Sequence, residues 1–140
     1  MLQVFEITQK GLTNSDSLSE IEWLIFVIDY FESVSTFQGW DHFFSYNMDW
    51  YPKVLELLEL ADDKASLSVL HNYEEHFKKL GVDFTSEAID NFLTNPPAGY
   101  LESCPDWRDE FVNLHNQRWK LITEYFKSKG VEIEAEYYDD

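Results

Sequence analysis

The chain has 140 residues, of which 44% are hydrophobic and 17% aromatic, so it can bury a core and does not have the composition of a disordered protein. Twenty-seven acidic residues against ten basic residues give a formal net charge of −17. A surface with this charge repels nucleic acid and anionic membranes, and it attracts basic surfaces.

The first elements expected along the chain are a short strand and a helix. Residues 1–12 contain LQVFEIT before Gly11, a segment that can form an N-terminal strand. Ser17 and Glu20 have the spacing of a capping box, in which each side chain bonds the backbone N–H of the other residue. Apolar residues then recur at helical spacing, and residues 23–28 are apolar on all sides. The sequence therefore predicts a central helix.

Residues 37–52, FQGWDHFFSYNMDWYP, form an aromatic segment in which seven of the sixteen side chains carry aromatic rings. Trp40, Phe43 and Phe44 lie on one face of a helix. A stacking platform for nucleic acid combines such rings with a positive groove, but this segment contains two aspartates and no lysine or arginine. We therefore expect the aromatic segment to lie in the core. The main alternative is a hydrophobic groove that binds a partner.

Start and stop signals delimit the remaining helices. They are KVLELLELA after Pro52, a helix capped by Asp62 or Asp63 and ended by Gly81, SEAIDNFL after Thr85, and PDWRDEFVNLHNQRWKLITEYFKSK before Gly130. The residues expected in the core are Trp40, Phe43, Phe44, Leu24, Ile28, Leu58, Leu70 and Trp119. The sequence thus predicts one mostly α domain over residues 1–130, with five to seven helices.

Residues 131–140 form an acidic C-terminal segment. Val131, Ile133, Ala135 and Tyr137 alternate with glutamates, and this period of two is typical of a strand. Such a strand can pair with LQVFEIT in a two-stranded ribbon, whose apolar side must rest on the helices because an isolated ribbon is only marginally stable. Pairing would hold the glutamates about 6.6–6.8 Å apart. A solvated, frayed end is the alternative.

The sequence contains no convincing catalytic or metal-binding motif. Cys104 is the only cysteine, so an intrachain disulfide is impossible, and acidic neighbours would raise its thiol pKa. His71 and His76 are five residues apart, whereas two ligands on one helical face are four apart. We therefore expect no cofactor and no metal. The N-terminus has no basic start followed by an apolar stretch, so we expect no signal peptide. The longest apolar run is too short to span a membrane, so we expect a cytoplasmic protein.

The acidic residues are the most informative feature. A globule of this length is about 37 Å across, and B-DNA of that length carries roughly 22 charges, so the net charge resembles that of a DNA segment of the same size. Half of the ten basic residues lie within residues 103–130, which leaves the rest of the chain strongly negative. The residues expected on an acidic binding face are Glu22, Asp29, Glu32, Glu56, Glu59, Asp62, Asp63, Glu132, Glu134 and Glu136.

Residues 32–47, ESVSTFQGWDHFFSYN, follow the pattern acid-x-Val-Asn-Asn-Gly-Gly-Phe-x-Gln-Tyr-Phe at Glu32, Val34, Gly39, Trp40, His42, Phe43 and Phe44. This segment resembles the signature of a bacterial family that includes a DNA-mimic protein and whose other members mostly have no assigned function. The segments WYPKVLELLELAD and PDWRDEFVNLHNQRWKLITEYF are also similar, so the resemblance covers about residues 20–127. It implies a helical domain. Thr36, Phe37 and Gln38 replace the Asn-Asn-Gly turn, so a function carried by that turn would be lacking here.

The composition and the resemblance together favour a non-enzymatic acidic binding protein. We expect it to act as a DNA mimic that occupies the basic, nucleic-acid-binding surface of a partner protein. An immunity-type inhibitor of a basic toxin is a related alternative, and a small enzyme that uses carboxylates in a cleft is an alternative of a different class. We expect a monomer or a homodimer that binds no nucleic acid and no membrane itself.

Overall fold

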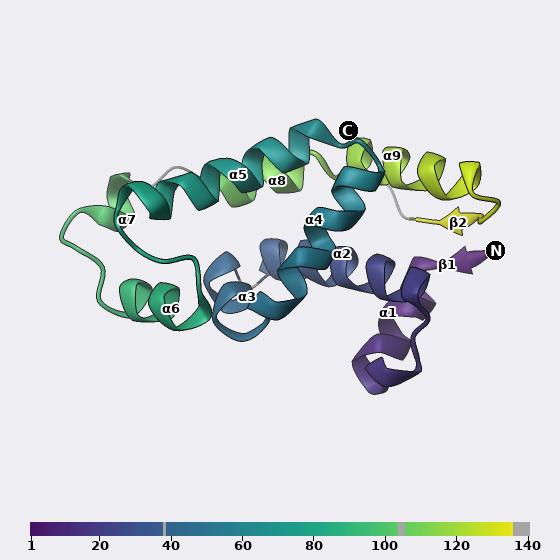
Figure 1. Ribbon diagram of the computed structural model, residues 1–140, viewed down its shortest axis with the longest axis horizontal. Helices are drawn as coiled ribbons and strands as arrows, with labels where there is room; N and C mark the ends of the chain where they lie inside the picture. The colour runs from purple at the N-terminus through teal and green to yellow at the C-terminus, as the bar shows by residue number, and fades with distance from the viewer. Residues whose placement is uncertain (38, 104–105, 136–140) are drawn as a thin grey trace.

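Helix α2 (Glu20–Phe37) is the central helix of the computed structural model, which describes residues 1–37, 39–103 and 106–135. It packs against α1 (Val4–Thr13), α3 (Trp40–Tyr46), α4 (Tyr51–Leu60) and α8 (Trp107–Asn113). The remaining helices are α5 (Lys64–Lys79), α6 (Ser86–Thr94), α7 (Tyr100–Ser103) and α9 (His115–Ser128), with short 3-10 helices at Ser15–Ser17 and Met48–Trp50. Figure 1 shows α6 and α7 at one end of the molecule and the two short strands at the other.

The prediction of a mostly α domain with a terminal ribbon is confirmed. Buried apolar residues from the helices form a core cluster together with Ile133. The described residues contain more helices than the predicted five to seven, because residues 4–13 form a helix where a strand was expected and the closing helix is interrupted at Leu114. At Leu114 the backbone has φ −89° and ψ 5°, which is the bridge region rather than the helical region.

The predicted N-terminal strand is only two residues long, Leu2–Gln3, and the chain then turns into α1. The buried residues Val4, Ile7 and Gly11 are three and four positions apart, which is the helical period and not the strand period. Gly11 lies against Phe26 of α2, because a Cβ atom at Gly11 would lie only 2.4 Å from that ring. Tertiary packing on α2 therefore favours a helix where local composition suggested a strand.

The capping box at the start of helix α2 lies two residues later in the chain than predicted. The capping box is formed by Ser19 and Glu22 rather than by Ser17 and Glu20. The Ser19 N–H donates to Glu22 Oε1 at 3.0 Å, and the Glu22 N–H donates to Ser19 Oγ at 3.2 Å. Ser17 instead lies in the preceding 3-10 helix. Both pairs have the same spacing, so only the structure decides between them.

Other helix ends follow the predictions. Asp63 caps α5 by accepting the Ser66 N–H, and Thr85 caps α6 by accepting the Ala88 N–H. Gly81 and Gly130 follow the ends of α5 and α9 with φ of +73° and +79°, a backbone region that glycine adopts without strain.

Four of the described aromatic rings of this segment, Trp40, Phe43, Phe44 and Tyr51, lie in the core, as predicted. Trp40, Phe43 and Phe44 of α3 are buried, and Trp40 donates its indole N–H to Ser35 Oγ at 2.6 Å. The Phe43 ring meets Phe31 of α2 edge to face with ring centres 4.6 Å apart. All the residues expected in the core are buried except Leu24, which is only partly buried and packs against the core from its edge. Within the aromatic segment, Tyr46 is 73% exposed.

The two ends of the described chain pair as a short parallel ribbon. Strand β1 (Leu2–Gln3) lies beside β2 (Ile133–Glu134) with Leu2 opposite Ile133, and the two are adjacent in Figure 1. Ile133 is buried against the helices, so the ribbon rests on the core as expected. Pairing is thus confirmed over two residues in each strand, whereas Glu136 and Tyr137 lie outside the described residues.

Candidate functional site

The predicted acidic face is divided between the surface and the interior. Glu56, Glu59, Asp62, Glu132 and Glu134 are exposed, Glu22 and Asp29 are half-buried, and Glu136 lies outside the described residues. Glu22 forms an ion pair with Lys10 at 3.2 Å in addition to its role in the capping box. Backbone hydrogen bonding by Ser19, with help from Lys10, lowers the pKa of Glu22 despite its partial desolvation.

Two of the predicted surface acids, Glu32 and Asp63, are buried, so their assignment to an exposed face is wrong. Asp63 is 1% exposed because it caps the buried N-terminus of α5. Glu32 is 7% exposed, because its position on α2 faces α9 rather than solvent. On an isolated helix Glu32 shares a stripe with Glu22 and Asp29, but the packing of α9 onto that stripe covers one end of it.

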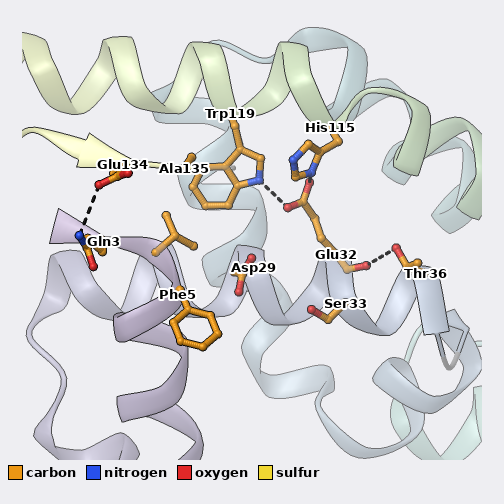
Figure 2. A pocket seen from close by; sticks show the side chains of 11 residues that line it. Gln3, Phe5, Asp29, Glu32, Ser33, Thr36, His115, Trp119, Glu134 and Ala135 are labelled. Atoms are coloured by element: carbon orange, nitrogen blue, oxygen red, sulfur yellow. Dashed lines mark hydrogen bonds and ion pairs between the residues drawn. The ribbon is translucent and has the colours of Figure 1, made fainter. Parts of the chain in front are cut away.

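Glu32 is the centre of a buried ionic cluster. Its Oε2 accepts the Nδ1–H of His115 at 2.9 Å and the Nε–H of Arg118 at 2.9 Å, and Arg118 donates from Nη2 to the same oxygen. Its Oε1 accepts the indole N–H of Trp119. Figure 2 shows Trp119 and His115 reaching down from α9 to the Glu32 carboxylate on α2. A carboxylate can only accept hydrogen bonds, so each of these neighbours serves as a donor.

Arg118 is 0% exposed and is satisfied from several sides. Besides Glu32, its Nη1 donates to Ser66 Oγ at 3.1 Å and to the Phe111 carbonyl at 3.0 Å, and its guanidinium carbon lies 3.8 Å from the Phe111 ring centre. At the interruption of the helix the Phe111 carbonyl accepts the Leu114 N–H at 3.2 Å as well as the Arg118 guanidinium. The guanidinium thus connects α2, α5, α8 and α9.

The electrostatics of the cluster keep Glu32 ionised. Desolvation by burial raises the pKa of this carboxyl, but the charge of Arg118 and the hydrogen bonds from His115 and Trp119 outweigh that effect. The pKa of Glu32 therefore lies below its usual value. A carboxylate held ionised by fixed donors is poorly suited to deliver a proton, so Glu32 is not placed to act as a general acid.

Sequence reasoning missed this cluster, although a signal for it exists. Arg118 stands in the apolar stripe of the closing helix, with Phe111 seven positions before it and Ile122 four positions after it. A basic residue on the buried face of a helix requires an internal acid, because an unpaired buried charge is strongly unfavourable. The sequence does not show which of the many acids it meets, since the pairing joins residues 86 positions apart.

A cavity of about 450 Å³ lies beside the ionic cluster, between the start of α1, helix α2, helix α9 and strand β2. Its described lining includes Phe5, Asp29, Glu32, His115, Trp119 and Glu134. Figure 2 shows Trp119 and His115 above Glu32 and Asp29, with Phe5 below and Glu134 turned toward Gln3. Asp29 accepts the Thr8 hydroxyl at 2.5 Å, and Glu134 accepts the Gln3 side-chain amide at 3.4 Å. The described lining contains no lysine and no arginine.

The histidines do not assemble a metal site within residues 1–37, 39–103 and 106–135, where no group of three or more potential ligands occurs. His71 is exposed, and His76 faces Tyr100 with its Nε2 2.9 Å from the hydroxyl. Partial desolvation and then the charge of Lys79 lower the pKa of His76. Cys104 lies outside the described residues.

No protein-family model, curated protein or solved structure matches this chain. The resemblance to the DNA-mimic family therefore stays a prediction. In the described part of the chain, none of the helices combines the length and the apolar character that a membrane span requires.

Proposed function

We propose that this protein is a non-enzymatic acidic binder that occupies the basic, nucleic-acid-binding surface of a partner protein in the cytoplasm, and so acts as a DNA mimic. The observation that carries the proposal is the location of the charge. In the described ranges the only buried carboxylic acids are Glu32 and Asp63, the only buried lysine or arginine is Arg118, and His115 is buried beside Glu32. These interior charges nearly cancel, so the net negative charge of the described residues belongs almost entirely to their surface.

The scaffold can hold surface carboxylates at defined separations. Glu56 and Glu59 are exposed and three residues apart on α4, where such side chains are about 5–6 Å apart at Cβ. Asp62 is also exposed, in the turn that follows α4, with a φ of +55°. Glu132 and Glu134 are exposed on alternate positions at the ribbon, which corresponds to about 6.6–6.8 Å. Such separations are comparable with those of successive phosphates on a DNA strand, and a helical core keeps them fixed.

An immunity-type inhibitor of a basic toxin is a variant of the same proposal, because it uses the same acidic surface against a different basic partner. The competing class, a small carboxylate-dependent enzyme, draws support from the cavity and its converging polar groups. The most deeply buried carboxylate of that cavity belongs to Glu32, and it already accepts hydrogen bonds from Arg118, His115 and Trp119. This occupation favours a structural role for the cluster and leaves the exposed acids as the basis of function.

The test is a pull-down from the native cell with the protein immobilised, at low and at high salt. An interaction carried by surface charge is screened by salt, so we expect basic DNA-binding proteins, or a basic toxin, to be recovered at low salt only. Competition by duplex DNA for the recovered partner then separates a DNA mimic from a toxin inhibitor that covers another basic site. Recovery of the same proteins at both salt concentrations, or of acidic proteins, contradicts the proposal.

A charge-neutralised variant tests the face directly. Glu56→Gln/Glu59→Gln/Asp62→Asn should weaken binding of the recovered partner and reduce its salt dependence. Glu132→Gln/Glu134→Gln tests the ribbon in the same way without removing β2. If partner affinity and salt dependence survive the second change, the ribbon is not part of the binding face.

A further inference from the structure

The cavity beside the ionic cluster has the chemistry of a receptor for a cationic side chain. Three of its described lining residues, Asp29, Glu32 and Glu134, are carboxylic acids, and none is lysine or arginine. Glu32 is paired with Arg118, whereas the carboxylates of Asp29 on α2 and Glu134 on β2 accept hydrogen bonds from the neutral side chains of Thr8 and Gln3. An occupant of this cavity is therefore selected for positive charge.

The walls of the cavity favour a planar cation. Phe5 lines the cavity although its side chain is 66% exposed, which is unusual for a ring of this size. Figure 2 shows Phe5 on the α1 side of the cavity and Trp119 on the α9 side. Aromatic faces attract guanidinium groups through cation–π contacts. Carboxylates bind the same group through paired N–H donors, a geometry that an ammonium group does not match.

We propose that this cavity receives an arginine side chain from the basic partner. The guanidinium lies between Asp29 and Glu134, with its flat face against Phe5. This inference rests on the proposed function, and it adds a defined contact to an otherwise diffuse electrostatic surface. A buried arginine in a pocket at the centre of an interface is a common source of binding free energy.

The experiment uses the full chain labelled with ¹⁵N and a probe peptide, acetyl-Ala-Arg-Ala-amide. A matched peptide in which citrulline replaces arginine has nearly the same shape without the charge. We expect the arginine peptide to shift the Gln3 side-chain amide and the backbone amides around Asp29 with saturation at millimolar concentration. We expect binding of the citrulline peptide to be at least tenfold weaker.

Variants decide whether the cavity or the overall charge binds the peptide. Asp29→Asn/Glu134→Gln should weaken the arginine peptide about tenfold, and Phe5→Ala should weaken it several-fold without changing the net charge. The control Glu87→Gln/Glu102→Gln removes the same charge from α6 and α7, at the far end of the molecule in Figure 1, and should change the affinity less than twofold. Equal weakening by both double variants, or equal binding of the citrulline peptide, overturns the inference.

The two proposals fail in distinguishable ways. If a basic partner is recovered in the pull-down but binds Asp29→Asn/Glu134→Gln as tightly as the unmodified protein, the cavity is not the arginine site while the acidic binder stands. If the arginine peptide occupies the cavity as described but no basic protein is recovered at low salt, the proposed function is wrong and the arginine selectivity of the cavity remains.

Discussion

Removing the charge of Glu32 should destabilise the protein more than the loss of one ordinary hydrogen bond. In Glu32→Gln the amide keeps nearly the same shape, but Arg118 remains at 0% exposure without its counter-ion. Breaking a buried ion pair on one side typically costs about 3–5 kcal/mol. That is a large part of the roughly 5–15 kcal/mol by which a domain is usually stable. Glu124→Gln, an exposed change on α9, should stay within about 0.5 kcal/mol.

A double-mutant cycle separates the ion pair from its surroundings. Arg118→Met should also be strongly destabilising, but Glu32→Gln/Arg118→Met leaves no charge uncompensated. The double variant is therefore expected to lose at least about 1 kcal/mol less than the sum of the single losses. Urea unfolding at pH 7, followed by tryptophan fluorescence, measures each free energy of unfolding. A loss under about 1 kcal/mol for Glu32→Gln, or strictly additive losses, would refute the assignment of Glu32 and Arg118 as a buried pair.

The lowered pKa of Glu32 also predicts that the free energy of unfolding falls at acidic pH. The pKa of Glu32 is lowered in the folded state, so above its usual value of 4.5 both states are ionised and the stabilisation is complete. As the pH falls below that value, the unfolded chain binds a proton first, and stability is lost until the pH reaches the folded pKa. Urea unfolding between pH 7 and pH 3 should therefore show a steeper acid limb for the unmodified protein than for Glu32→Gln. Parallel limbs would contradict the lowered pKa.

The remaining predictions concern packing and capping. Trp40→Ala should cost roughly 3–5 kcal/mol, as large core truncations do, and an unchanged melting temperature would show that the aromatic segment is not core. Gly11→Ala, normally favourable in a helix, should instead cost about 1–3 kcal/mol through overpacking, because the new Cβ would meet the buried Phe26 ring; a stabilised variant would contradict the close packing of α1 on α2. Asp63→Ala should cost about 1–2 kcal/mol through the lost N-cap bond to Ser66, whereas exposed Asp62→Asn should change the urea midpoint little.

The sequence by itself determines the features that depend on neighbouring residues. The helical period of apolar residues predicts α2 and α5, and the capping residues Asp63 and Thr85 mark helix starts as the structure shows them. Start and stop signals act within one helical turn, so they can be read locally. The absence of basic residues from the aromatic segment is equally local, and it argued against a nucleic-acid platform, whereas the choice between core and partner groove needed the structure.

Where the sequence was compatible with two local structures, tertiary packing determined which one forms. Ser17 and Ser19 each precede a glutamate by three residues, and the pair used is the one compatible with the 3-10 helix that joins α1 to α2. Residues 4–13 could be assigned to a strand until the fit of Gly11 against α2 is known. In both cases the conformation is selected by the free energy of contacts between helices. A pattern of neighbouring residues carries no information about those contacts.

The ionic cluster and the cavity were decided by the tertiary structure alone. Glu32 belongs to the same helical stripe as Glu22 and Asp29, and nothing within that helix separates a buried carboxylate from a solvated one. The separation is made by α9, which brings Arg118 to Glu32 from 86 positions along the chain. Burial is a property of the assembled fold, so a sequence this rich in acids shows how much charge the protein carries, while only the packing of its helices shows which carboxylates face a partner.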